Sequence, residues 1–137
     1  MKIKNYLEAR KWLRGYRLIE KEVKARMQYL DDFKKISKIS SYDKNPAINK
    51  ILRAIESDTK RKILKLQKRI NDIEKALDKL DDFERNVLYH RYILGIEWIK
   101  LPEYILYEQR TCQLIEVRAL KKIAKMNIEW SGNNDDE

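Results

Sequence analysis

Apolar residues recur every three or four positions through most of the chain, which is the spacing that buries one face of an α-helix. In the first third, one stripe of this kind consists of Ala9, Trp12, Tyr16, Ile19, Val23, Met27, Leu30 and Phe33. Gly15 lies inside the stripe, but its cost of roughly 1 kcal/mol relative to alanine is too small by itself to end a long amphipathic helix. We therefore expect one helix over about residues 3–36.

A second long helix is expected over about residues 46–80. Serines, Asn45 and Pro46 cluster in residues 37–46, where Asn45 is a typical N-cap and Pro46 suits the first helical position. The later half of this helix carries a heptad seam formed by Ile63, Leu66, Ile70, Ile73, Leu77 and Leu80. An apolar stripe with a slip in phase precedes the seam and is formed by Ile48, Leu52, Ile55 and Thr59. Two such helices joined by a short loop usually pack as an antiparallel hairpin. A hairpin cannot bury both faces, so we expect it to pack on a second chain, with a dimer favoured, or on the C-terminal part.

The third region, residues 81–126, has the pattern of three short helices. Asp81 and Glu84 have the spacing of a capping box, and Gly95 is placed to end this helix in a left-handed conformation. Its predicted buried face is Phe83, Val87, Leu88, Tyr92 and Ile93. A short helix over 97–106 with Trp98, Leu101 and Ile105 follows, and then a helix over 109–126 whose inward face holds Cys112, Ile115, Ala119, Leu120 and Ile123. The chain is therefore predicted to be all-α, with a coiled-coil-like hairpin over 1–80, a helix-turn-helix domain over 81–126 and an acidic, disordered tail over 127–137.

Composition narrows the class of protein. Among 137 residues, 39% are charged, and there are three glycines, two prolines and one cysteine. A single Cys112 forms no internal disulfide, so we expect a reducing, cytoplasmic location. No stretch has the length of a signal-peptide core or a membrane span, so no membrane partner is expected.

The net charge of +9 is unevenly distributed. Residues 1–80 contain 23 Lys and Arg against 11 Asp and Glu, whereas residues 81–126 contain eight against seven. A basic chain favours a polyanionic partner. A lysine-rich, solvated helix face explains the same numbers equally well, so composition leaves both open.

Residue types give little support for catalysis or for a bound metal. His90 is the only histidine and Cys112 the only thiol, so a zinc site is not expected. There is no glycine-rich phosphate loop and no nucleophile–base arrangement. We expect neither an enzyme nor a cofactor.

The helix over 109–126 has the side chains of a DNA-reading helix. Gln109, Arg110, Gln113 and Glu116 are expected on its outward N-terminal face, where Gln and Arg match adenine and guanine edges and Glu accepts from cytosine. Thr111 is placed for a phosphate or a thymine methyl group. Backbone contacts are expected from Arg118, Lys121, Lys122 and Lys125. The alternative is a small three-helix core with a solvated charged face.

Residues 80–125 resemble region four of bacterial sigma-70 factors, and more closely the RinA/ArpU-like regulators of phages and prophages. The resemblance rests on a Leu-x-x-Phe-Glu-Arg-x-Val-Leu opening at Leu80, an Arg-Tyr-Ile-x-Gly segment at Arg91, Trp98, and the last helix from Arg110. It implies a DNA-binding activator of phage late genes, including packaging and lysis functions, in the cytoplasm of a bacterial host, with possible contact to RNA polymerase. Two residues depart from the pattern. Pro102 should kink the first helix of the motif or delay its start, and Glu108 is a poorer N-cap than serine or threonine.

Two hypotheses follow. The first is a sequence-specific transcriptional regulator that reads double-stranded DNA with the helix over 109–126. The second is a helical protein-interaction or DNA-packaging adaptor whose N-terminal arms carry the activity.

Overall fold

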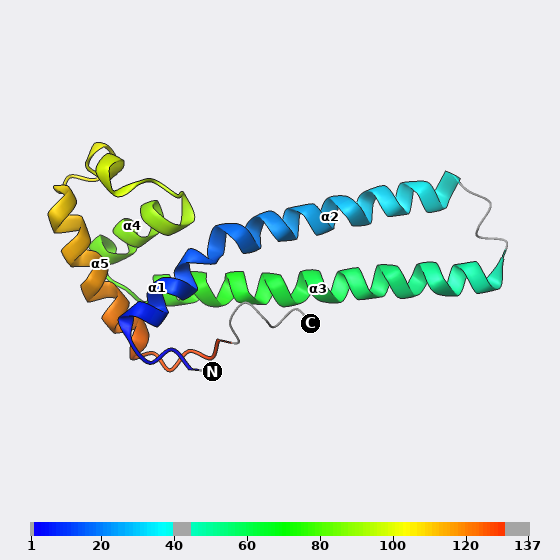
Figure 1. The fold of residues 1–137 in the computed structure, drawn as a ribbon, viewed down its shortest axis with the longest axis horizontal. Coiled ribbons are helices and arrows are strands. Elements are labelled where there is room, and N and C mark those ends of the chain that lie inside the picture. Colours follow the sequence, from blue (N-terminus) through cyan, green and yellow to red (C-terminus); the bar gives the residue numbers. More distant parts are fainter. Residues whose placement is uncertain (1, 40–44, 131–137) are drawn as a thin grey trace. The chain divides into compact units, whose positions relative to one another are not determined.

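The computed structural model of the protein describes residues 2–39 and 45–130 (Figure 1). These residues are mostly helical and include no strand, only a single antiparallel bridge between Lys2 and Glu129. The predicted all-α class is confirmed. Contacts divide the chain into two compact units, which we call the head unit, Met1–Leu18 with Ile70–Glu137, and the two-helix unit, Ile19–Arg69. This division differs from the predicted boundary at residue 80, since the first 18 residues and the end of the second long helix belong to the head unit.

The helices follow one another with short connections. In chain order they are α1 (Tyr6–Arg14), α2 (Tyr16–Ile39), α3 (Pro46–Asp78), α4 (Asp82–Leu88), the π-helical turn η2 (Tyr89–Ile93), the 3-10 helix η3 (Trp98–Glu103) and α5 (Gln109–Ala124). No described helix is long and apolar enough to span a lipid bilayer.

The prediction of one uninterrupted helix over 3–36 is wrong, because the helix is interrupted at Gly15. The Gly15 N–H donates to the Trp12 carbonyl oxygen at 3.3 Å, three residues back, which tightens the end of α1 before α2 begins at Tyr16. The start also lies later than expected. The Asn5 side chain accepts a hydrogen bond from the Glu8 N–H at 2.9 Å and so caps α1.

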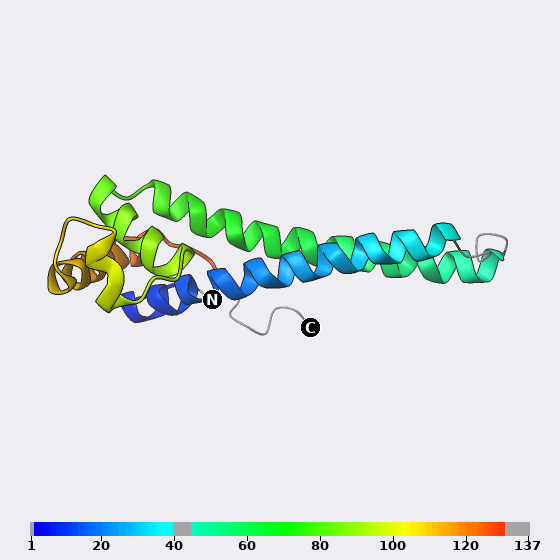
Figure 2. The ribbon, with the colours of Figure 1, turned by 90° about the horizontal axis from the view of Figure 1, so that it is seen from above.

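In the two-helix unit, α2 and α3 run in opposite directions and lie side by side in both views (Figures 1 and 2). Among the described residues of this unit, the buried side chains are Ile19, Val23, Thr59, Ile63 and Leu66. The buried hydroxyl of Thr59 donates to the Ile55 carbonyl oxygen at 2.9 Å, so its polarity is satisfied within α3. Met27, predicted in the apolar stripe, is 47% exposed. Most of the residues between the two helices, 40–44, lie outside the described ranges.

The head unit has one main core, to which α1, the end of α3, α4, η2 and α5 contribute. Its buried members include Ala9, Trp12, Leu13, Ile73, Leu77, Leu88, Tyr92, Ala119, Leu120 and Ile123. A second cluster joins α4, η3 and the first half of α5: Val87, Leu101, Ile105, Cys112 and Ile115. The predicted inward face of α5 is thus confirmed in full. Because α5 belongs to both clusters, its outer face is fixed by packing at both of its ends.

The segment after α5 returns to the start of the chain. The Ile3 N–H donates to the Ile128 carbonyl oxygen at 3.0 Å, and Ile128 and Trp130 pack against the main core. The predicted disordered tail therefore does not begin at residue 127. Its remainder, residues 131–137, lies outside the described ranges.

Candidate nucleic-acid interface

The N-terminal half of α5 presents the predicted reading side chains. Gln109, Arg110 and Gln113 are exposed and Thr111 is half-buried. Leu114, on the same outer side of the helix, is 64% exposed. Glu108 occupies the N-cap position with an extended backbone, but its side chain makes no capping hydrogen bond. The first turn of α5 is therefore not capped by the side chain of Glu108.

Two features define the turn before η3: the conformation of Gly95 and the contacts of Arg91. Gly95 has φ +74°, the left-handed conformation predicted for it, and the Arg17 guanidinium occupies the space where a Cβ atom would lie. Arg91 lies over the rings of Tyr92 and Trp98, at 5.6 and 5.4 Å from their centroids. Its Nε atom is buried and has no hydrogen-bond partner among the described residues.

Pro102 falls inside η3, a 3-10 helix that is shorter than the predicted helix over 97–106. Pro102 does not delay the start of the helix, which begins at Trp98, since the Lys100 and Leu101 N–H groups both donate to the Glu97 carbonyl oxygen. Proline lacks the donor that a continuing α-helix needs at this position. The chain therefore forms about two tight 3-10 turns and then leaves the helix at Tyr104.

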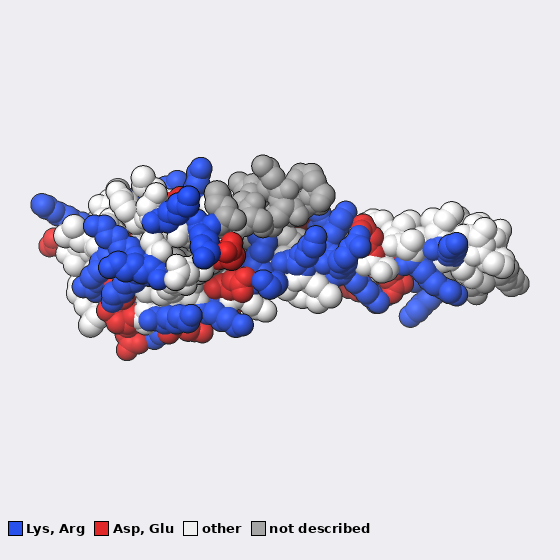
Figure 3. All heavy atoms as spheres, turned by 90° about the horizontal axis from the view of Figure 1, so that it is seen from below, with Lys and Arg blue, Asp and Glu red and all other residues white. Residues whose placement is uncertain are grey.

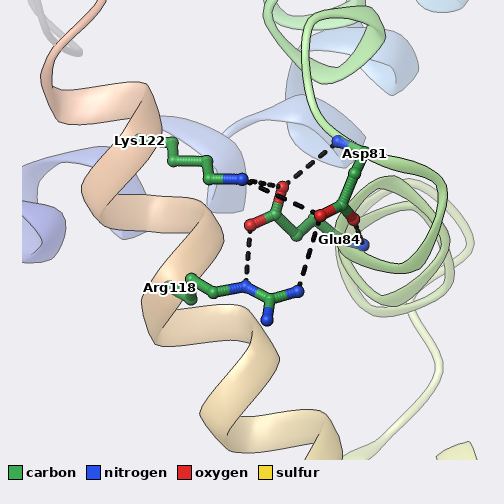
Figure 4. A network of polar contacts seen from close by, with 4 residues as sticks. All are labelled: Asp81, Glu84, Arg118 and Lys122. Carbon is green, nitrogen blue, oxygen red and sulfur yellow. Dashed lines mark hydrogen bonds and ion pairs between the residues drawn. The ribbon is translucent and has the colours of Figure 1, made fainter.

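A buried carboxylate, Glu84, fixes one flank of α5 (Figure 4). It is fully buried, and it accepts hydrogen bonds from Arg118 Nε at 3.0 Å, Lys122 Nζ at 2.8 Å and the Asp81 backbone N–H at 3.1 Å. Asp81 in turn caps α4 by accepting from the Glu84 N–H at 2.8 Å, which confirms the predicted capping box. This arrangement satisfies a buried charge, because all three of these hydrogen-bond partners donate to the carboxylate.

Asp81 completes the same network at its solvent side. Its carboxylate lies 3.6 Å from Arg118 Nη2 and 3.8 Å from Lys122 Nζ. The hydrogen bond from the Glu84 N–H lowers the pKa of Asp81, and the charges of Lys122 and Arg118 lower it further. Arg118 and Lys122, predicted as phosphate-binding residues, thus already have carboxylate partners, although about half of each side chain is exposed.

Glu116 was predicted on the outward reading face, and this is wrong, because its side chain is buried. Its carboxylate accepts from Arg10 Nη2 at 2.9 Å and from the Tyr92 hydroxyl. The hydrogen bond to Glu116 raises the pKa of Arg10 although burial opposes the shift. Burial, and then the bond to Glu116, raise the pKa of Tyr92. Glu116 therefore joins α1, η2 and α5 and has no access to a base.

Lys121 takes an intermediate place. It is exposed, and its Nζ atom lies 5.9 Å from the centroid of the Tyr6 ring of α1. Arg10 lies over the same ring at 5.7 Å. The C-terminal half of α5 is thus partly covered by α1, whereas Arg110 and Gln113 are not involved in any such contact.

Phe83 corrects the predicted buried face of the third region. Phe83 is 56% exposed, and its ring centroid lies 5.7 Å from that of Tyr107 in an edge-to-face arrangement. The neighbouring Glu84 takes the buried position. The sequence does not predict three contacts that hold α5: those of Arg10 and of the Tyr92 hydroxyl with Glu116, and those of the buried Glu84 with Arg118 and Lys122. The capping-box spacing was the available signal for Glu84. No sequence signal links Arg10 to Glu116, which lies 106 positions away.

Comparison with protein-family models, with curated proteins and with solved structures finds no match. Among residues 2–39 and 45–130, no group of three or more His, Cys, Asp or Glu side chains is arranged to hold a metal ion. Burial raises the pKa of the Cys112 thiol, which disfavours the reactive thiolate form.

Proposed function

We propose that the protein is a DNA-binding transcriptional regulator that reads duplex DNA with the N-terminal half of α5. One observation carries the proposal: Gln109, Arg110 and Gln113 are exposed on a helix whose opposite face is buried in both core clusters. These side chains make bidentate hydrogen bonds to purine edges in the major groove. The first turns of a recognition helix are the part that enters the groove.

In this proposal α4, η2, η3 and α5 form a sigma-region-four-like helix-turn-helix, and the two-helix unit is a hairpin arm through which two chains associate. The left-handed turn at Gly95 and the succession of η3 and α5 support that interpretation. By its resemblance to RinA/ArpU-like regulators, the protein activates phage late genes and contacts host RNA polymerase. Lys121 then lies beyond the reading residues, where a contact to a phosphate fixes register, whereas Arg118 and Lys122 are held by Glu84.

The proposal is tested by selecting bound sequences from a pool of random duplex DNA with the full chain, and then measuring affinity by fluorescence anisotropy. Arg110→Ala and Gln113→Ala should each relax preference at particular base pairs, by about 1–3 kcal/mol per position. Lys121→Ala should weaken binding evenly across sequences.

Lys79→Ala is the matched control, because Lys79 is an exposed cation of the head unit outside α5. It should leave base preference unchanged. If no sequence is enriched from the pool, or if Arg110→Ala changes preference no more than Lys79→Ala does, the proposal is wrong.

A second candidate function is a helical interaction or DNA-packaging adaptor that acts through the two-helix unit. It is favoured by large apolar side chains that this unit leaves exposed: Ile36, Ile51 and Leu64, at 61%, 59% and 65%. For this function, Ile51→Asn with Leu64→Asn in the full chain should change its mass in analytical ultracentrifugation, while Arg110→Ala is silent in every assay.

A further inference from the structure

Nearly all of the net charge belongs to the two-helix unit. Ile19–Arg69 contains 15 Lys and Arg against seven Asp and Glu, whereas the head unit contains 16 against 15. The predicted reading helix thus belongs to an almost neutral unit. A nearly neutral unit gains little from counterion release when it meets DNA, because that gain grows with the number of phosphates neutralised.

The charge of the two-helix unit is concentrated on the face of α3 that points away from its buried stripe. The buried positions are Thr59, Ile63 and Leu66. The exposed cations that helical periodicity places on the outer face are Lys50, Arg53, Lys60, Arg61, Lys65 and Lys68. In Figure 3, Lys and Arg predominate over Asp and Glu on the visible face of the two long helices.

Three of these six cations, Lys50, Arg53 and Lys65, have no carboxylate partner among the described residues. Lys60 pairs with Glu56 at 2.8 Å, and Asp58 is shared by Arg61 at 2.5 Å and Lys62 at 3.3 Å. Residues 50–68 therefore carry seven cations against two carboxylates over about 27 Å of helix, at ~1.5 Å per residue.

The outer face of α2 is different. Its exposed Lys21, Lys24 and Lys35 are interspersed with Asp31 and Asp32. Charge complementarity to a polyanion is thus a property of α3 and not of the two-helix unit as a whole. The same face of α3 also has a hollow, lined by Arg53, Glu56, Ser57, Lys60, Arg61 and Leu64.

We infer that the outer face of α3 is a second, sequence-independent binding surface for the phosphate backbone of duplex DNA. The linear row of cations matches a linear row of phosphates. Single-stranded nucleic acid is disfavoured as the partner, because its binding sites combine positive charge with aromatic side chains on which bases stack. α3 contains no Phe, Trp or Tyr. The choice of DNA rather than another polyanion rests on the proposed function.

The test compares two variants of the full chain that lose the same charge. The α3 variant is Lys50→Gln with Arg53→Gln and Lys65→Gln, which breaks no ion pair between described residues. The control is Lys21→Gln with Lys24→Gln and Lys35→Gln on α2. Glutamine is a good helix former, so helix content by circular dichroism and the melting temperature should stay close to those of the parent in both.

Binding of a scrambled-sequence duplex is followed by fluorescence anisotropy between 50 and 200 mM salt. Each lost phosphate contact reduces the slope of log K against log salt by about 0.9, so the α3 variant should lose about 2–3 units of slope and at least about tenfold in affinity. The α2 control should lose less than about 0.5 unit. Equal losses in the two variants would overturn the inference, because binding would then depend only on net charge.

Competition tests the class of partner. When competitor concentrations are expressed per charged group, unlabelled duplex DNA should displace the labelled duplex at a lower concentration than single-stranded DNA or polyglutamate does. If either of these two competitors is as potent as duplex DNA, the inference is overturned. The outcome is separable from that of the proposed function. An Arg110→Ala, Gln113→Ala variant tests base preference alone, and the α3 variant should keep that preference while binding every sequence more weakly.

Discussion

Glu84 offers the sharpest test of how α5 is held, because its charge can be removed without changing its volume. The side chain is fully buried and accepts from Arg118 at 3.0 Å, from Lys122 at 2.8 Å and from the Asp81 backbone N–H at 3.1 Å. Glu84→Gln keeps one acceptor oxygen and replaces the other with an amide donor. That donor must face one of the two cations, so at least one charge-assisted hydrogen bond is lost.

The expected loss is about 2 kcal/mol in the free energy of unfolding. A hydrogen bond to a charged group contributes about 1.5–3 kcal/mol, and losing one partner of a buried pair costs about 3–5 kcal/mol when the other charge stays buried. Arg118 and Lys122 are 54% and 49% exposed, so water solvates them once Glu84 no longer does. The loss therefore lies toward the lower of these two ranges.

Urea unfolding followed by tryptophan fluorescence measures this loss in the appropriate unit, since Trp12, Trp98 and Trp130 all belong to the head unit. A double-mutant cycle with Arg118→Gln should give a coupling free energy of about 1 kcal/mol or more, as expected for residues in one network. Glu103→Gln, at an exposed position, is the control and should change stability by less than about 0.5 kcal/mol. A Glu84→Gln protein within about 0.5 kcal/mol of the parent would refute the reasoning, because the buried carboxylate would then contribute no more than a surface residue.

Three further changes probe other parts of the head unit. Gly95→Ala should lower the free energy of unfolding by about 1–2 kcal/mol because alanine is strained at the left-handed φ of +74°, and the clash with Arg17 should lower it further. Adding Arg17→Ala should recover only the loss that comes from the clash. Tyr92→Phe tests how the stability of the head unit depends on pH. Because the pKa of Tyr92 is raised in the folded protein, its hydroxyl contributes fully to the free energy of unfolding below about pH 10, and this contribution is lost as pH rises further. In urea unfolding, the parent should therefore lose stability relative to the variant above that pH. A constant difference between pH 8 and 11 would contradict this. Glu116→Gln should destabilise the head by about 1–2 kcal/mol and leave base preference unaltered; altered preference at unchanged stability would mean that Glu116 does reach DNA.

Local signals predicted the elements of this fold well, because helix caps and apolar spacing depend on neighbouring residues. The capping box at Asp81, the N-cap at Asn45, the left-handed Gly95 and the inward face of α5 are all found where the sequence places them. Helix propensity alone predicts no interruption at Gly15. The propensity cost of glycine is small. The end of α1 is determined instead by the hydrogen bond from the Gly15 N–H to the carbonyl oxygen three residues back and by the packing of α1 in the head unit.

The errors at Phe83 and Glu116 share a physical cause. Phe83 and Glu84 are both spaced to lie beside Val87 on a helix, and hydrophobicity favours Phe83 for the core. Glu84 is buried instead because two cations from α5 satisfy its charge there. Glu116 likewise depends on Arg10 of α1. A local pattern carries no information about partners so far away in the chain, so periodicity cannot distinguish an exposed carboxylate from a buried, neutralised one.

These buried carboxylates also determine how much positive charge α5 can offer a polyanion. Arg118 and Lys122 already neutralise Glu84, and Arg10 neutralises Glu116. Arg110 is proposed to read bases, so the cations left for phosphates that form no ion pair with a described residue are Lys121 of α5 and Lys125 at its C-cap. Two phosphate contacts correspond to a salt slope of about −1.8, which is small for a duplex-binding protein. If the chain binds DNA with a clearly steeper slope, the additional contacts must come from cations outside α5, and the outer face of α3 is the largest exposed group of them in the two-helix unit.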